Sequence, residues 1–380
     1  MELDLDARKQ QQRLHHDSHC LCYVRQGNRL SAKANKCEGH QGALHLLFNA
    51  VSPQVRQDGR QGMKTVIIGA GLGGLIAAHV SNYTPLVLDS GKKLASNLGE
   101  MIGTRFVGDS AELRHLFGYN GPSSPVLVTY DEADAMSSLT DYIRKTRNCD
   151  LRDIPEKQRP SMEEWGLGSF DRLPIDVNGW FDSTAQKAGV VFGSWIDSIK
   201  QEDSHSSIVL SNGSSVPAAK IVSTIPLPFI MRIVGIPGAD KFRALPITIG
   251  RYQVDGLQEP LPATIHHITT LSSPVSRIIT HDRYIIVEAP SYQDPRLMSI
   301  MMEEAESRAR DLHANSPVRV VAFATFHHHF VYFSSFEEHR EKALAALKEI
   351  GIYSLGRHAR YDNSLKLLET YRQAKQMVTV

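Results

Sequence analysis

Residues Thr65-Val-Ile-Ile-Gly69-Ala-Gly71-Leu-Gly73-Gly74 decide the fold. The first four are a run of β-branched apolar residues, which is typical of a strand buried on both faces of a parallel sheet. The glycines follow at once in a G-x-G-x-x-G pattern, and apolar residues 75–80 then open a helix. A glycine-rich turn between a strand and a helix is the context in which this pattern binds the pyrophosphate of a dinucleotide.

Each glycine of this turn has its own expected role. Gly69 allows the tight turn, Gly71 lets the backbone approach the pyrophosphate, and Gly74 lets the helix pack closely on the strand. Residues 85–89 form the expected second strand, and its last residue, Asp89, is placed to accept hydrogen bonds from the ribose hydroxyl pair. An acid at this position disfavours the 2′-phosphate of NADP. The predicted cofactor-binding residues here are Gly69, Ala70, Gly71, Gly73, Gly74, Asp89 and Ser90.

This pattern does not separate NAD from FAD, and a glycine-rich turn in an unrelated α/β protein is the alternative. The C-terminal region decides between the cofactors. A helical pattern over 337–350 is followed by a predicted strand over 351–355, by Gly356-Arg357-His358-Ala359-Arg360-Tyr361, and by a last helix over 364–377. This segment resembles the C-terminal flavin-binding signature of the amine-oxidase and UDP-galactopyranose mutase-like flavoproteins. The resemblance implies that Gly356 and Arg357 contact FAD.

Two further stretches resemble the same family. Residues 176–192 are similar to the segment before its middle strand, and 208–213 begin a hairpin with an Asn-Gly turn. Residues 219–228 then resemble the returning strand, whose T-I-P-L turn, beginning at Thr224, lies beside the flavin in that family. The resemblance covers 63–90, 174–235 and 340–377. It implies an α/β protein with a Rossmann-like FAD-binding domain and a discontinuous second, α+β domain that contains a mostly antiparallel sheet.

The domain boundaries follow from these segments. We expect the FAD-binding domain to comprise 63–105, 174–235 and 336–380, and the substrate domain to comprise 106–173 and 236–335. Residues 1–62 differ in composition from the remainder and are expected to be a disordered extension or upstream sequence. A zinc site of Cys20, Cys22, Cys37 and His40 is the alternative, but their spacing fits zinc knuckles poorly. We therefore predict no metal.

The substrate side carries weaker signals. Ser273-Pro-Val-Ser-Arg277-Ile278 resembles the family's P-x-x-R-[IV] strand, in which the arginine holds an anionic substrate or the flavin; a surface arginine is the alternative. Tyr361 and Asn363 are further predicted substrate-binding residues. The adjacent histidines at 266–267 and 327–329 would point to opposite faces of a strand, which argues against a metal site. Residues 94–103 hold only Gly99 and Gly103 where the family has a Gly-Gly pair, which weakens a mutase assignment.

The resemblance implies an FAD-dependent oxidoreductase that acts on a C–N bond, with a small-molecule or nucleotide-linked substrate. A narrower hypothesis is the phage flavoprotein lyase that cleaves an amino-acid adduct on thymine, whose partner is modified DNA. The alternatives are a UDP-sugar mutase-like enzyme and a non-catalytic FAD- or NAD-binding module. No catalytic residue is assigned.

Composition limits the partners and the cellular location that we expect for the protein. The 380 residues include 42 Lys+Arg and 41 Asp+Glu, a net charge of +1, which disfavours a surface that coats nucleic acid nonspecifically. Four cysteines are too few to cross-link a chain of this length, so we expect reduced thiols and a cytoplasmic location, in the host cytoplasm if the protein is viral. With no apolar stretch of 18 residues, no membrane-spanning helix and no membrane partner are predicted.

A truncation tests the expected extension. A protein that begins at Met63 should keep its melting temperature and its cofactor, because the predicted fold begins there. Differential scanning calorimetry of the full and shortened chains measures this directly. Loss of folding on truncation, or zinc bound in a one-to-one ratio by the full chain, would contradict the expectation.

Overall fold

The computed structural model describes residues 22–26, 29–33, 64–92, 104–131, 140–142, 145, 168–290, 296–313, 318–334, 337–362 and 365–378. The chain divides into two units, Met1–Met63 and Lys64–Val380. In the first unit, β1 (Cys22–Gln26) and β2 (Arg29–Lys33) form an antiparallel pair. Cys20, Cys37 and His40 of the zinc hypothesis lie outside the described residues.

A five-stranded parallel sheet forms the first core of the second unit. In spatial order its strands are β18 (Ile352–Ser354), β12 (Lys220–Ser223), β3 (Thr65–Ile68), β4 (Leu86–Leu88) and β8 (Val190–Val191). The middle strand is fully buried at Val66 and Ile67, whose side chains point to opposite faces. Burial on both faces explains the uninterrupted apolar run in the sequence. The strands predicted near 65–69, 85–89, 219–224 and 351–355 are thereby confirmed.

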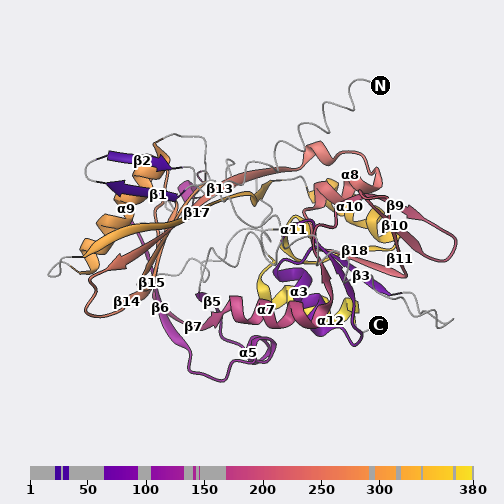
Figure 1. Cartoon of the computed structure of the whole chain (residues 1–380), viewed down its shortest axis with the longest axis horizontal. Coiled ribbons are helices and arrows are strands. Elements are labelled where there is room, and N and C mark those ends of the chain that lie inside the picture. The colour runs from indigo at the N-terminus through magenta and orange to yellow at the C-terminus, as the bar shows by residue number, and fades with distance from the viewer. Residues whose placement is uncertain are drawn as a thin grey trace, which may run out of the picture. The chain divides into compact units, whose positions relative to one another are not determined.

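Helices cover both faces of this sheet. One face packs against α3 (Leu72–Val80), α5 (Ala111–Phe117), α7 (Val177–Ala188) and α12 (Leu367–Val378). Figure 1 shows α3, α7 and α12 gathered beside β3. The other face packs against α8 (Leu227–Val234), η3 (Ala239–Lys241), α10 (Glu337–Glu349) and a three-stranded antiparallel sheet of β9 (Ile196–Gln201), β10 (Ser206–Leu210) and β11 (Ser215–Ala218). The predicted Asn-Gly hairpin is the β10–β11 pair.

An eight-stranded sheet forms the second core. Its order is β17 (Arg319–Ser334), β13 (Arg243–Asp255), β16 (Tyr284–Ala289), β15 (Arg277–Asp282), β14 (Leu261–His267), β6 (Ser124–Tyr130), β7 (Gly168–Asp176) and β5 (Thr104–Gly108). Only β14 and β6 run parallel among these neighbours. Two expected domain boundaries, after residues 105 and 173, fall inside β5 and β7 of this sheet.

One long helix, α9 (Leu297–Leu312), covers one face of the eight-stranded sheet (Figure 1). Its buried residues recur every four positions, at Leu297, Met301, Ala305 and Ala309. They pack against sheet residues that include Ile278 and Val287. The strand-rich expectation for 236–335 did not include this helix.

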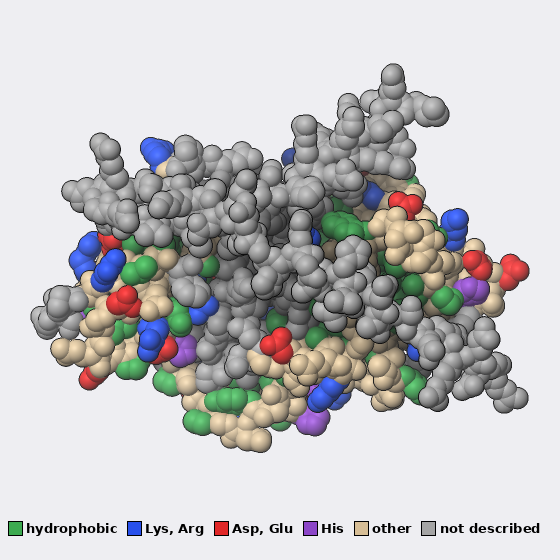
Figure 2. Space-filling view, in the orientation of Figure 1, with side chains coloured by type: hydrophobic (Ala, Val, Ile, Leu, Met, Phe, Trp, Pro, Cys, Tyr) green, Lys and Arg blue, Asp and Glu red, His purple; other side chains and the backbone are tan. Residues whose placement is uncertain are grey.

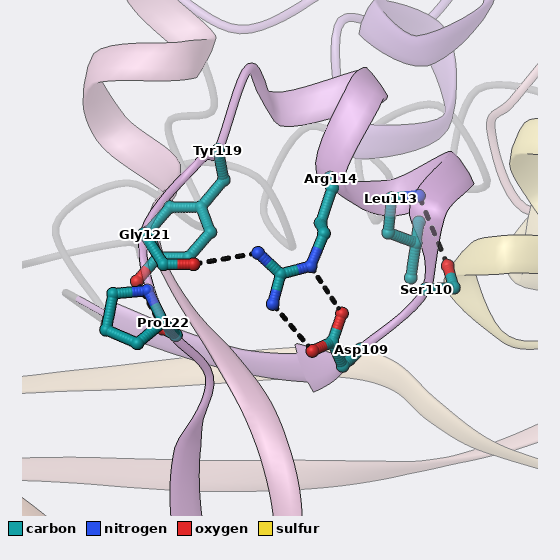
Figure 3. Close-up of polar contacts among 7 residues, drawn as sticks. All are labelled: Asp109, Ser110, Leu113, Arg114, Tyr119, Gly121 and Pro122. Atoms are coloured by element: carbon teal, nitrogen blue, oxygen red, sulfur yellow. Dashed lines mark hydrogen bonds and ion pairs between the residues drawn. The ribbon is translucent and has the colours of Figure 1, made fainter.

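A network of hydrogen bonds and one ion pair holds the segment between β5 and β6 in place. The Arg114 guanidinium donates two hydrogen bonds of 2.7 Å to the Asp109 carboxylate and a third, also 2.7 Å, to the carbonyl of Gly121. The Ser110 hydroxyl caps α5 by accepting from the Leu113 amide at 3.2 Å (Figure 3). These contacts hold the buried face of α5 in the same core as α3, although 106–173 was expected to belong to the substrate domain.

The parallel ends of β6 and β14 are tied by Asp131. Its two carboxylate oxygens accept from the amide and hydroxyl groups of Thr269 and Thr270, at 2.7–3.2 Å. Burial opposes ionisation, but these four hydrogen bonds outweigh it and lower the pKa of Asp131 to about 2. The Lys145 ammonium donates to the carbonyls of Ile268 and Thr270 beside it, at 3.0 and 2.9 Å.

Figure 2 shows positive and negative side chains interspersed over the visible surface of the described residues. Within the same part of the chain, none of the helices combines the length and the apolar character needed to cross a bilayer.

Asp131→Asn should destabilise the protein in a pH-dependent way. The folded pKa lies below the unfolded value of about 3.9, so the contribution is present above pH 4 and is lost as the pH falls towards 2. We expect the melting temperature at pH 7 to drop by roughly 2–4 °C, the shift that about 1 kcal/mol produces in a chain of this size. The gap between variant and wild type should close at low pH. Glu259→Gln, an exposed acid-to-amide change, is the matched control; a pH-independent gap for Asp131→Asn would contradict the assignment.

Candidate functional site

The glycine turn after β3 is built by close backbone contacts. Gly69 has φ of +100°, a conformation that residues with a side chain rarely adopt. A Cβ atom at Gly69 would lie 2.6 Å from the Thr224 hydroxyl, and one at Gly74 would lie only 1.8 Å from the carbonyl oxygen of Gly69. The first turn of α3 therefore packs directly on the end of β3, which is the close helix–strand approach that the sequence predicts.

Gly71 differs from its neighbours. It has extended backbone angles and occupies the position just before the first residue of α3, and a Cβ atom there would have no heavy atom within 4 Å. The packing of the described protein thus does not require glycine at this position. Open space next to the N-terminus of a nine-residue helix, with its free amide groups and positive dipole end, suits a phosphate group.

Thr224 supports the turn from the neighbouring strand. Its hydroxyl donates to the carbonyls of Ile68 and Gly69, at 2.9 and 3.2 Å, and its amide donates to Ile68 as well. These bonds join the ends of β12 and β3 beneath the glycines. The structure thus gives Thr224 a supporting role, and its contact with a cofactor stays a prediction.

Asp89 lies at the end of β4, directly beside the same turn. One carboxylate oxygen accepts from the Ala70 amide at 2.6 Å, and the other accepts from the Gly91 amide at 2.7 Å. Ser90, between these residues in sequence, is exposed. An ionised carboxylate has about four acceptor positions, so ribose hydroxyls can still be accommodated. The sequence predicted the ribose role but not this second role in fixing the turn.

The C-terminal signature meets the glycine turn. The amide of Leu355, at the end of β18, donates to Ser223 of β12 at 2.9 Å, and its carbonyl lies 3.7 Å from the Cβ position of Gly73. Gly356 follows with φ of +83° and begins the short helix α11 (Gly356–Arg360), against Thr370 of α12. The structure therefore brings together, at one sheet edge, two motifs from opposite ends of the sequence.

The remaining residues of the C-terminal signature are placed differently. Arg357 is partly buried in α11. Tyr361 is only 2% exposed, and its ring contacts Phe242 edge-on with centroids 5.1 Å apart. The structure thus places Tyr361 in the protein core, while its assignment to the substrate stays a prediction. Asn363 lies outside the described residues.

Arg277 lies on β15 of the eight-stranded sheet, whereas the glycine turn follows β3 of the parallel sheet. Its Nε and one terminal nitrogen donate to the same oxygen of Glu288, at 2.8 and 2.5 Å. Glu288 is its cross-strand partner on β16. The sequence motifs did not single out this acid, although a lone glutamate in the apolar strand 284–289 is a visible signal.

The adjacent histidines of β14 point to opposite faces, as predicted. His266 Nδ1 lies 2.8 Å from the Thr129 hydroxyl, whereas His267 stacks on Tyr130 with centroids 5.2 Å apart and an interplanar angle of 17°. Burial, followed by the nearby Arg277 guanidinium, lowers the pKa of His267 to about 3, so its imidazole is neutral at neutral pH. Nowhere in the described residues do three or more His, Cys, Asp or Glu side chains gather as metal ligands.

No protein-family model matches the sequence, and no curated protein matches it. Solved structures do match over most of the chain. Reduced UDP-galactopyranose mutase superposes with a TM-score of 0.62 and 14% identity, over 83% of this chain and 95% of that one. The chain has the same fold.

Two further structures agree with this fold. An oxidoreductase from Methanosarcina mazei has a TM-score of 0.51 and 11% identity, covering 84% of this chain and all of that one. Aklavinone-11 hydroxylase, in complex with FAD and aklavinone, has a TM-score of 0.53 and 13% identity, covering 84% of this chain and 63% of that one. The mixed α/β architecture expected from the sequence is therefore found in solved proteins.

Two glycine variants distinguish packing from an open site. Gly74→Ala should lower the free energy of unfolding by roughly 1–3 kcal/mol or more, because the new methyl group collides with the Gly69 carbonyl. Gly71→Ala should cost no more than about 1 kcal/mol, the usual penalty for alanine at a helix N-cap. Urea denaturation of the cofactor-free proteins measures both. Equal destabilisation would show that Gly71 is also a packing residue.

Proposed function

We propose that the protein is an FAD-dependent oxidoreductase of the amine-oxidase and mutase-like type. The observation that carries the proposal is the open space at Gly71, at the N-terminus of α3, in a turn whose other glycines are closely packed. A similar fold holds FAD in the aklavinone-11 hydroxylase complex. The tight turn, the helix N-terminus and the terminal acid together fit the diphosphate and ribose of a dinucleotide.

The residues assigned to FAD surround this edge of the parallel sheet. The amide groups at the start of α3, next to Gly71 and Gly73, would receive the diphosphate. Asp89, with its carboxylate already oriented by the Ala70 amide, would receive the ribose hydroxyls. FAD is favoured over NAD because the Gly356–Arg357 turn resembles a flavin-binding signature. This turn directly follows Leu355, whose carbonyl lies beside Gly73 of the glycine turn. Bound FAD supplies an acceptor for hydride from a carbon beside nitrogen.

The finer assignment is a C–N bond in a small-molecule or nucleotide-linked substrate. An amino-acid-modified thymine in phage DNA is one such substrate, and oxidation of its α-carbon followed by hydrolysis of the imine gives the lyase outcome. The resemblance of the sequence motifs supports this proposal. We also propose a cytoplasmic location, on the basis of the four cysteines in 380 residues. A UDP-sugar mutase-like activity is the second candidate, favoured by the structural similarity to UDP-galactopyranose mutase.

The cofactor assignment predicts a yellow protein that releases FAD, rather than FMN or NAD, on heating. Gly71→Val should fold with unchanged circular dichroism and lose nearly all FAD, because its side chain would occupy the space of the diphosphate. Asp89→Asn should weaken FAD binding roughly 10- to 150-fold, the loss expected for a charge-assisted hydrogen bond. Absorbance at 450 nm relative to protein concentration measures occupancy. Full occupancy in Gly71→Val would place the cofactor elsewhere.

Catalysis is tested separately from binding. Anaerobic addition of an amine substrate should bleach the flavin absorbance of an oxidoreductase, and UDP-galactopyranose should be converted by a mutase. A flavin-containing protein that is reduced by no amine and converts no sugar nucleotide would be a passive FAD-binding module.

A further inference from the structure

Helix α11 carries the Gly356–Arg357 turn, but it is too short to be stable by itself. It has five residues, and isolated helices shorter than about 12 residues are marginal in water. The Tyr361 amide closes its C-terminal end by donating to the His358 carbonyl at 3.3 Å. The Asp362 amide donates to the carbonyl of Arg357 at 3.0 Å. Contacts with the rest of the protein must therefore hold this helix in place.

The chain reverses direction sharply after α11. Tyr361 has φ of +51°, a left-handed conformation that is costly for a residue with a bulky side chain. Its ring lies in the core beside Phe242, and the next residue, Asp362, lies against α10. A strained backbone of this kind persists only where the surrounding structure determines it. The residues that contact Tyr361 and Asp362 therefore decide where α11 ends.

Arg340 of α10 makes the contact with Asp362. One terminal nitrogen of its guanidinium, Nη1, lies 3.7 Å from a carboxylate oxygen of Asp362. Its Nε and Nη2 donate to the neighbouring Glu341, at 3.2 and 2.8 Å. The Arg340 side chain is only 4% exposed, whereas Glu341 is exposed. Since Ala343 and Leu347 anchor α10 in the same core as β18, the ion pair joins the end of α11 to a fixed element.

Folding stability alone does not account for a buried guanidinium. Removing an arginine and a carboxylate from water is costly, and apolar residues of similar size often give equal or greater stability. Unlike an apolar contact, an ion pair is satisfied by one partner in one arrangement, so it specifies where two elements lie. Here one of those elements is the short helix that carries Arg357.

We propose that Arg340 is a positioning residue, which acts through Asp362 to fix α11 and with it the Gly356–Arg357 turn. The carbonyl of Leu355, directly before α11, lies beside Gly73, so a shift of α11 would alter the sheet edge to which the cofactor is assigned. The inference rests on the proposed function for its effect on FAD, whereas its effect on α11 is independent of that function. Arg340 acts without touching the cofactor, which distinguishes it from the residues assigned above.

Hydrogen–deuterium exchange of the full chain tests the effect on α11. Arg340→Met/Asp362→Asn removes both charges and leaves side chains of similar size. Exchange in residues 356–362 should become roughly 10-fold faster, because the end of the helix is then free to open. The melting temperature should stay close to that of wild type, because neither charge is left buried without its partner.

A second ion pair between two helices provides the matched control. Arg372 of α12 donates to Glu112 of α5 at 2.6–3.2 Å, and the Arg372 side chain is 54% exposed. Arg372→Met/Glu112→Gln also removes one charge of each sign. It should change neither the exchange of 356–362 nor the affinity for FAD, because exposed ion pairs contribute little.

Titration of the same variants with FAD, followed by flavin fluorescence, tests the link to the cofactor. Arg340→Met/Asp362→Asn should bind FAD roughly 10-fold more weakly than wild type. Arg340→Lys should keep most of the wild-type affinity, because the contact with Asp362 uses a single nitrogen, which an ammonium can supply. The visible circular dichroism of bound FAD should change in the double variant and not in Arg340→Lys, which a general loss of stability would not produce.

Three results would overturn the proposal: unchanged exchange of 356–362 in the double variant, faster exchange throughout the chain together with a lower melting temperature, or faster exchange of 356–362 with unchanged FAD affinity. If the double variant does not fold, Asp362→Asn takes its place, since Arg340 then keeps Glu341 as a partner. A protein that binds no FAD contradicts the proposed function, while the exchange of 356–362 still decides the role of Arg340.

Discussion

The contact between the first turn of α3 and the end of β3 is the constraint on which the rest of the site depends. A single hydrogen atom on Gly74 is all that fits against the Gly69 carbonyl, so the helix axis can approach the strand end closely. This approach aims the helix N-terminus at the edge where β3, β4, β12 and β18 all end. Thr224 and Asp89 then reinforce the turn from the strands on either side. Because Gly69, Gly74, Thr224 and Asp89 are held by these contacts, the space beside Gly71 stays open.

The parallel core was predictable from the sequence because each of its strands is a short apolar run beside a glycine or turn signal. The second core was predictable only in kind. Its richness in strands could be read from the sequence, but the order that places β6 between β14 and β7 depends on long-range pairing that no local pattern encodes. Helix α9 was missed because two of its four buried residues, Ala305 and Ala309, contribute little apolar signal.

The residues assigned to binding also fall into those that the sequence predicts and those that it does not. The glycine turn could be predicted because its residues are consecutive and each has a steric reason. The Arg277–Glu288 pair could not, because a cross-strand partner is fixed by register, and register is a tertiary property. Tyr361 has a packing role that its motif position did not indicate, since its ring lies in a core beside Phe242. A motif indicates which backbone is special, but the direction of each side chain is decided by packing.

The order of the parallel strands also has a consequence for biosynthesis. Neighbouring strands β3, β12 and β18 come from the beginning, middle and end of the second unit. On the ribosome, β12 and Gly73 lack their neighbours β18 and α11 until residues 352–360 have been synthesised, and such non-local pairing is slow to form. The nascent chain therefore leaves one edge of the apolar strand β12 unpaired from the synthesis of residue 223 until that of residue 352. A chaperone that shields this edge of β12 would therefore act before β18 is made.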